Sequence, residues 1–125
     1  MTIFNPYLNF AGNTEEAFNF YRSVFGGEFP SVVRFKDMPI PGVSIPKEAG
    51  DKIMHIGLPI GKGQMLMASD ALESLGQKLV QGNNVHIMIQ PDSKEEADRL
   101  FSALSAGGKI EMPMAASRGA ITTAR

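Results

Sequence analysis

Hydrophobic and polar positions along the chain predict two similar strand–helix units. Each unit opens with a strand-like run, at 7–10 and at 85–89, and continues into a segment whose apolar residues recur at the spacing of one helix face. These apolar positions are Ala17, Phe18, Tyr21, Val24 and Phe25 in the first unit and Ala97, Leu100, Phe101 and Leu104 in the second. A Gly-Gly pair follows each helix and ends it. We interpret the units, about 80 residues apart, as two copies of one supersecondary module.

The two predicted helices share a start signal. Asn13 stands three residues before Glu16, and Ser93 stands three residues before Glu96. Such a pair is typical of a capping box, in which the first side chain accepts a hydrogen bond from a free backbone N–H and the helix dipole favours the acid. We therefore expect the helices to begin at these two positions.

Further strands complete the predicted pattern. Three follow the first helix and one follows the second, at 32–35, 53–58, 65–67 and 109–112. The first unit is thus β-α-β-β-β, and the second begins in the same way. The stretch between Lys36 and Asp51 is rich in proline and glycine, so it is expected to be a long loop, either a lid or a plain surface excursion. Residues 72–82 link the units as a short helix or irregular chain.

Composition and charge narrow the class of protein. The 125 residues fit one domain, carry a net charge of −1 and contain no cysteine. Nucleic acid is not expected as a partner because Lys and Arg are not clustered, and cysteine chemistry is excluded outright. No apolar run approaches the ~20 residues of a membrane helix, and the N-terminus lacks the features of a signal peptide. We therefore expect a cytoplasmic protein with no membrane partner.

Several short motifs, taken in their order and spacing, resemble one known family. They lie at 6–13, 17–27, 38–39, 53–55, 67–71 and 108–112. This series resembles the PhnB-like (YjdN-like) branch of the vicinal oxygen chelate superfamily, which includes glyoxalase I, extradiol dioxygenases and bleomycin resistance proteins. The resemblance implies an α+β fold with paired βαβββ modules, which form a cupped mixed sheet with the helices on the outside.

The resemblance also implies an organisation for the whole chain. We expect a single glyoxalase-like domain over 1–125, with module one at about 3–70, a linker at about 71–82 and module two at about 83–125. After Met114 the chain lacks the hairpin and final strand expected of this family, so module two is predicted to be incomplete at its C-terminus. Three explanations stay open: a truncated or frame-shifted end, a partner chain that completes the sheet, and a divergent short form.

The residues disfavour the metal site that the resemblance implies. In metal-dependent relatives each module supplies one ligand from its first strand and one from its last, mostly His and Glu. Here His86 is the only candidate, its repeat mate is Pro6, and residues 64–69 hold no His or carboxylate in matching positions. We therefore expect no cofactor and disfavour a divalent ion. For His86 a place in a pocket wall is favoured over a structural role, and a structural role over metal binding.

The predicted strands supply candidates for the wall of a small-molecule pocket. These are His86, His55, Met88, Met65, Met67, Phe35 and Tyr7. Core filling is the competing role for the methionines, and a structural hydrogen bond is the competing role for His55. Ser69-Asp70 is interpreted as a turn after a strand rather than a catalytic pair, because the spacing places no base beside the serine.

Three functions are compatible with these features. The favoured one is binding of an unknown small molecule in a dimeric cupped pocket. The others are a metal-dependent lyase, isomerase or dioxygenase of the vicinal oxygen chelate type, motivated by His86, and a structural dimer without a ligand. A homodimer is expected because an open sheet edge must be covered or paired. Whether the protein is an enzyme is left open at this point.

Overall fold

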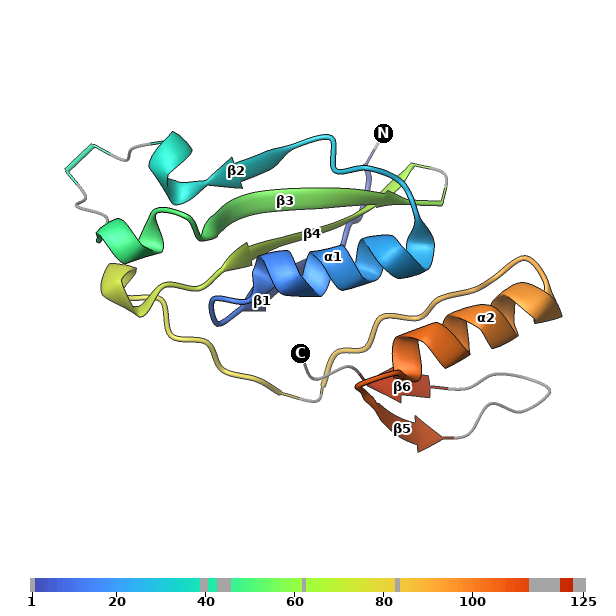
Figure 1. Ribbon diagram of the computed structural model, residues 1–125. Coiled ribbons are helices and arrows are strands. Elements are labelled where there is room, and N and C mark those ends of the chain that lie inside the picture. Colours follow the sequence, from blue (N-terminus) through green and yellow to red (C-terminus); the bar gives the residue numbers. More distant parts are fainter. Residues whose placement is uncertain are drawn as a thin grey trace.

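The fold is seen in a computed structural model, which describes residues 2–38, 41–42, 46–61, 63–82, 84–112 and 120–122 (Figure 1). Two α-helices and six strands make up its regular elements. They are β1 (Tyr7–Phe10), α1 (Thr14–Phe25), β2 (Val32–Arg34), β3 (Ile53–Ile60), β4 (Gln64–Asp70), α2 (Lys94–Ser105), β5 (Lys109–Met112) and β6 (Ala120–Thr122). Short 3-10 turns lie at Phe35–Asp37, Lys47–Ala49 and Glu73–Leu75. No helix in the described ranges is long and apolar enough to span a membrane.

The first unit forms one mixed sheet. Its strand order is β1-β4-β3-β2, with β1 parallel to β4 and the other pairs antiparallel. A parallel pair requires a crossover, and the chain between β1 and β4 supplies it through α1 and the β2–β3 hairpin. The predicted β-α-β-β-β order and the α+β class are therefore confirmed (Figure 1).

One face of this sheet packs against α1. The period-2 alternation of β3 and β4 turns the buried residues Ile56, Leu58, Leu66 and Ala68 toward the helix. Phe18 of α1 is fully buried at the centre of this core. Leu100 and Leu104 place one face of α2 in the same cluster, and α1 and α2 are in contact. The helical spacing in the sequence thus identified the core-facing side of both helices.

The start of α1 differs from the expected capping box. Asn13 occupies the N-cap but makes no hydrogen bond through its side chain. Instead, the buried carboxylate of Asp70 accepts hydrogen bonds from the Thr14 backbone N–H at 3.0 Å and the Thr14 hydroxyl at 2.6 Å, both at Oδ1. Its Oδ2 accepts one from the Ile53 backbone N–H at 2.8 Å. The interpretation of Ser69-Asp70 as a turn was wrong, because both residues end β4 and Asp70 joins three elements.

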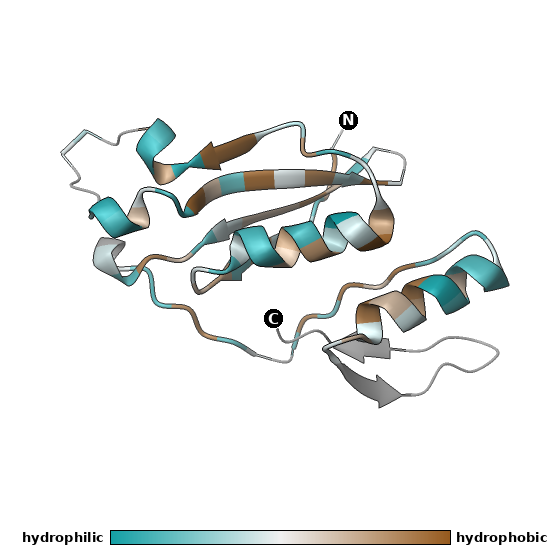
Figure 2. Cartoon of the chain, viewed as in Figure 1, coloured by the Kyte–Doolittle hydropathy of each residue, from teal (hydrophilic) through white to brown (hydrophobic). Residues whose placement is uncertain are grey.

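The second unit departs further from expectation. Residues 85–89 are not a strand: they run without strand pairing, and Val85, Ile87, Met88 and Ile89 are exposed. Figure 2 colours parts of this segment, which leads into α2, as hydrophobic. The sequence pattern suits a strand, but no strand in the described part of the chain lies beside it to supply backbone partners. β5 and β6 form a separate antiparallel pair.

The second capping box is half confirmed. The Ser93 hydroxyl oxygen accepts a hydrogen bond from the Glu96 backbone N–H at 3.1 Å. The Glu96 carboxylate turns to the Arg99 guanidinium instead of the N-cap backbone, forming an exposed ion pair. The serine therefore accepts a hydrogen bond from one free N–H of α2, while the glutamate forms an ion pair with Arg99 one turn further along the helix.

Candidate functional site

The sheet face opposite α1 gathers most of the predicted pocket residues. Every second residue of each strand points to this side of the sheet. No helix in the described part of the chain covers it (Figure 1). We call it the open face. It consists of Tyr7, Asn9, Val33, His55, Gly57, Pro59, Met65, Met67 and Ser69.

Four of these side chains surround Gly57 at the centre of the open face. Tyr7 pairs with Met67 across β1 and β4, and Met67 pairs with Gly57 across β4 and β3. Because Gly57 has no side chain, Met65 extends over it, and its Sδ lies 2.7 Å from the position that a Cβ would occupy. The rings of Tyr7 and His55 lie 6.0 Å apart between centroids, with planes inclined by 31°. The two rings and the two methionines thus occupy neighbouring positions on one face of the sheet.

The centre of the open face is partly buried and its edge is polar. Tyr7 remains 47% exposed, whereas His55, Met65 and Met67 are half-buried. At the edge, the Ser69 hydroxyl donates to the Asn9 side-chain oxygen at 3.2 Å. An apolar, aromatic centre with a few polar atoms beside it is the usual composition of a small-molecule site.

Three predicted pocket residues lie elsewhere. Phe35 is buried in a small separate cluster with Ala49 and Leu72, and the first two of these belong to the 3-10 turns of the β2–β3 connection. His86 and Met88 lie on the exposed 84–90 segment, where Met88 is 68% exposed. The structure therefore brings together Tyr7, His55, Met65 and Met67, and it does not bring the other three candidates to them within one chain.

The donors present do not fit the divalent-ion site of metal-dependent relatives. Within the described ranges, no three His, Asp or Glu side chains gather closely enough to hold an ion. His55 has no carboxylate or second histidine on the open face, and Asp70 at the end of β4 is directed to the core, where its oxygens accept three hydrogen bonds. Within the described residues of one chain, a His and Glu cage of that kind is not assembled.

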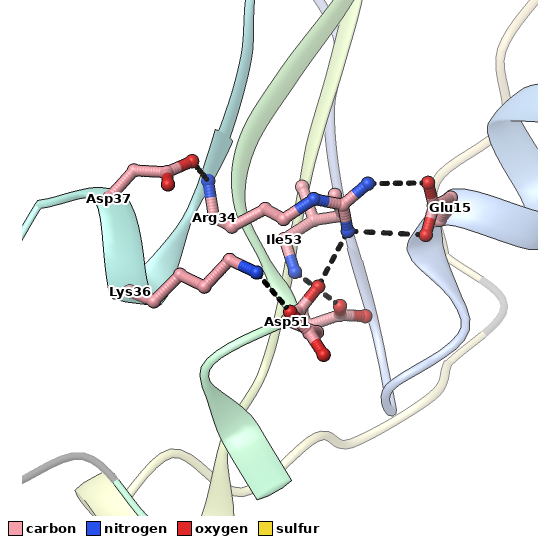
Figure 3. A network of polar contacts seen from close by, with 7 residues as sticks. Glu15, Arg34, Lys36, Asp37, Asp51 and Ile53 are labelled. Atoms are coloured by element: carbon pink, nitrogen blue, oxygen red, sulfur yellow. Dashed lines mark hydrogen bonds and ion pairs between the residues drawn. The ribbon is translucent and has the colours of Figure 1, made fainter. Parts of the chain in front are cut away.

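A charged network joins α1 to the loop between β2 and β3 (Figure 3). The Arg34 guanidinium donates to both carboxylate oxygens of Glu15, at 3.2 and 2.6 Å, and to the Asp51 backbone carbonyl at 2.6 Å. The Lys36 ammonium lies 2.6 Å from the Asp51 carboxylate. The hydrogen bond from Arg34 holds the pKa of Glu15 below its usual range, and that from Lys36 does the same for the pKa of Asp51. The network fixes the loop that carries the chain into β3.

Acidification is expected to weaken this network. Since the pKa of Glu15 is lower in the folded than in the unfolded chain, its stabilising effect is complete above the ordinary value of 4.5 and is lost as the pH falls through the folded value. The Glu15 side chain is half exposed, so the effect is limited to ~0.5 kcal/mol. Urea unfolding of Glu15→Gln, at neutral pH and below 4.5, should show a smaller loss on acidification than the parent. Glu16→Gln, which removes a neighbouring acid, should retain the parental loss.

A separate hollow lies beyond the ends of β1 and β4. Its volume is about 580 Å³, and it is lined by Ala11, Ala71, Glu73, Gln77, Leu79 and Gln81. It contains none of the open-face residues and no histidine or methionine. The hollow therefore brings together Glu73, Gln77 and Gln81, and the predicted pocket residues lie outside it.

Comparisons with known proteins identify the family of the chain. The model of the Glyoxalase/Bleomycin resistance protein/Dioxygenase superfamily matches residues 3–119. Protein YjdN of Escherichia coli (strain K12) is 33% identical over 118 residues, covering 86% of this chain and 76% of the relative.

Two solved structures share the fold. Protein PA1353 from Pseudomonas aeruginosa superposes with a TM-score of 0.76 at 38% identity, covering 90% of this chain and 79% of that one. The PhnB protein from Bacillus cereus gives a TM-score of 0.65 at 27% identity, with coverage of 90% and 80%. The chain therefore belongs to the Glyoxalase/Bleomycin resistance protein/Dioxygenase superfamily, in its PhnB/YjdN-like branch.

Proposed function

We propose that this protein binds a small organic molecule on the open face, inside a cup that a second copy of the chain completes. The observation that carries the proposal is the surface around Gly57, where Tyr7, His55, Met65 and Met67 form an aromatic and thioether patch that no helix in the described ranges covers. Methionine adapts its shape to irregular apolar ligands and makes favourable contacts with aromatic rings. Tyr7 and His55 add polar atoms that can orient a ligand.

The second copy is supported by the unpaired segment 85–89. In an extended chain Val85, Ile87 and Ile89 share one side, while His86 and Met88 share the other. β1 and β2 are the edges of the four-stranded sheet, and an edge strand presents backbone groups to a strand from another chain. Pairing there would cover the apolar side of the segment and place further side chains beside the cup. Such pairing would also explain why a strand-like sequence at 85–89 has no strand partner in the described part of one chain.

The proposal is one of binding and contains no reaction step. The resemblance to resistance proteins that bind small molecules supports it, as does the poor fit of the donors to a divalent ion. A serine lies on the open face at Ser69, but its hydroxyl hydrogen-bonds to Asn9 and not to a histidine. A nucleophilic serine needs a hydrogen bond to a general base, and the Ser69 hydroxyl bonds to an amide oxygen instead.

The binding proposal can be tested with 8-anilinonaphthalene-1-sulfonate, a small apolar aromatic dye. We expect saturable fluorescence enhancement with the full-length folded protein, and shifts of the Met65 and Met67 methyl resonances on titration. Met67→Glu places a charge at the centre of the open face and should abolish the enhancement, because burying an unpaired charge is costly. Val80→Glu makes the same change at an exposed linker position and should bind dye as the parent does.

Either of two results would overturn the proposal. If the dye does not bind saturably, the open face is not a small-molecule site, and the structural-dimer explanation is favoured. If the dye binds but Met67→Glu does not reduce the enhancement, the dye occupies another surface and the assignment to the open face is wrong. Circular dichroism of each variant establishes that the comparison is between folded proteins.

A further inference from the structure

The hollow beyond the ends of β1 and β4 has the size of a small-molecule site. Its volume of about 580 Å³ lies within the range of ~300–1,000 Å³ that is usual for ligand pockets. Two segments far apart in the sequence enclose it: Ala11 follows β1, and residues 71–81 lead away from β4. None of the lining residues belongs to the open face, so the hollow is a separate candidate site.

Backbone hydrogen bonds hold the wall that follows β4. The Ala71 N–H donates to the Phe10 carbonyl at 2.7 Å, which joins the ends of β4 and β1. The 3-10 turn Glu73–Leu75 then ends at Gly76, which adopts the left-handed conformation at φ 79° and donates its N–H to the carbonyl of the first turn residue at 2.9 Å. Leu72 is buried in the second hydrophobic cluster and anchors the turn. The wall of the hollow is therefore tied to the sheet and to the core.

Gln77 is fixed in this wall by two hydrogen bonds to one residue. Its backbone N–H donates to the Leu72 carbonyl at 3.0 Å, and its side-chain oxygen accepts from the Leu72 N–H at 3.0 Å. A glutamine amide carries an acceptor oxygen and an NH2 group with two donors. Because the oxygen is engaged, the NH2 group is the part of Gln77 that is available to a ligand. Gln81 brings a second amide to the hollow, and Leu79 contributes a half-buried apolar side chain.

Glu73 is the single charged side chain among the residues that line the hollow. A glutamate is ionised at neutral pH, and in the described ranges Glu73 forms no ion pair. The Lys52 ammonium, which lies next to the Ala11 side of the hollow, donates to the Gly12 carbonyl at 2.9 Å instead. The hollow thus presents a negative charge that no ion pair within the described residues compensates.

A carboxylate beside two amides is complementary to an ammonium group on a hydroxylated carbon skeleton. Charge strengthens the hydrogen bonds between a carboxylate and an ammonium, and amide groups can both donate to hydroxyl groups and accept from them. We propose that the hollow binds a small hydroxylated amine, with Glu73 pairing with its ammonium and with Gln77 and Gln81 contacting its hydroxyl groups. Leu79 and the two alanines contact the carbon skeleton. This site does not depend on the function proposed for the open face.

Pairs of compounds that differ only by an ammonium in place of a hydroxyl test the proposal. We would titrate the full-length protein at neutral pH with glucosamine against glucose, and with ethanolamine against ethylene glycol, and follow its amides by NMR. The amines should give saturable shifts of the Gln77 and Gln81 side-chain NH2 signals. The neutral compounds should bind at least about three-fold more weakly, since they lack the charge that pairs with Glu73.

Substitution of the carboxylate gives the matching result from the side of the protein. Glu73→Gln should weaken amine binding about three-fold to five-fold, which is the range for an exposed ion pair, and leave the binding of the neutral compounds unchanged. Glu95→Gln removes an exposed acid at the start of α2, outside the hollow, and should bind the amines as the parent does. Equal affinity for an amine and its neutral partner would overturn the proposal, as would unchanged amine affinity in Glu73→Gln.

A steric variant tests the location without removing a polar group. Ala11 is exposed at the edge of the hollow, so Ala11→Phe adds a large side chain at a lining position. It should weaken the amines and the neutral compounds alike, in a protein whose circular dichroism matches the parent. Amines that do not bind saturably, or that shift only signals outside residues 71–81, would show that the hollow is not their site.

The two proposals can fail separately because the hollow and the open face share no residue. Met67→Glu should leave the amine-induced shifts of Gln77 and Gln81 unchanged, although it is expected to abolish dye binding. A parent protein that fails to bind the dye but binds amines in a Glu73-dependent way would remove the proposed function and leave the hollow as a site. Dye binding without amine binding would do the reverse.

Discussion

Asp70→Ala is expected to lower the free energy of unfolding by about 3–5 kcal/mol, because it leaves three buried donors without an acceptor. The carboxylate is 2% exposed and accepts hydrogen bonds from the Thr14 backbone, the Thr14 hydroxyl and the Ile53 backbone. Two of these donors, the backbone and the hydroxyl of Thr14, lie at the start of α1, and the third, the backbone of Ile53, lies at the start of β3. A single substitution therefore weakens the attachment of the helix to two strands.

Urea denaturation monitored by circular dichroism would measure this effect. Thr14→Val removes only the hydroxyl donor and should cost about 1 kcal/mol, because the carboxylate keeps its two backbone partners. Asp51→Ala removes an exposed carboxylate paired with Lys36 and should leave the unfolding midpoint nearly unchanged. A cost for Asp70→Ala no greater than that for Asp51→Ala would show that the buried carboxylate does not join these elements.

The parts of the fold that local patterns specify were predictable. The helix spacing of Phe18 and Tyr21 requires one buried face whatever lies opposite, and the structure buries both. Alternation in β3 and β4 likewise fixed which residues face the core and which face outward. Each of these patterns repeats over several residues, so the prediction depends on no single contact.

The parts that depend on distant partners were not predictable. Asp70 lies 56 residues from Thr14, and the sequence around it reads equally well as a turn. Asn13 had the correct type for an N-cap, but a carboxylate brought in by β4 satisfies the helix start. A strand also needs a neighbouring strand, and the described part of one chain provides none for the pattern at 85–89.

In the candidate site, too, the residues fixed by local patterns were predictable and those that depend on distant partners were not. Tyr7, Met65 and Met67 were identifiable because alternation in two adjacent strands fixes a common face. The role of Gly57 was missed, since the absence of a side chain leaves no signal in a hydrophobic pattern. The position of His86 relative to these residues depends on what pairs with its segment, and this is where the proposal of a second copy makes its strongest prediction.

Ile87→Asp is expected to convert the proposed dimer into a monomer, raising the dissociation constant at least about 100-fold. The parent side chain is 48% exposed in one chain and lies on an unpaired apolar segment whose covering by a second copy we propose. An aspartate there would be buried without a partner on association, at a cost of several kcal/mol, and 1.4 kcal/mol corresponds to a factor of ten. Ile89→Asp, on the same side of the extended segment, should act alike.

Sedimentation velocity over a range of protein concentrations distinguishes the outcomes, with Val80→Asp as the matched control. Val80 is 79% exposed, is also β-branched and lies in the linker before the segment, so the same charge there should leave the dimer intact. A parent protein that sediments as a monomer at every concentration, or a Val80→Asp effect as large as that of Ile87→Asp, would remove the second copy from the proposal. Binding to the open face would then have to occur within one chain, where His86 and Met88 lie on the exposed segment outside the four-stranded sheet.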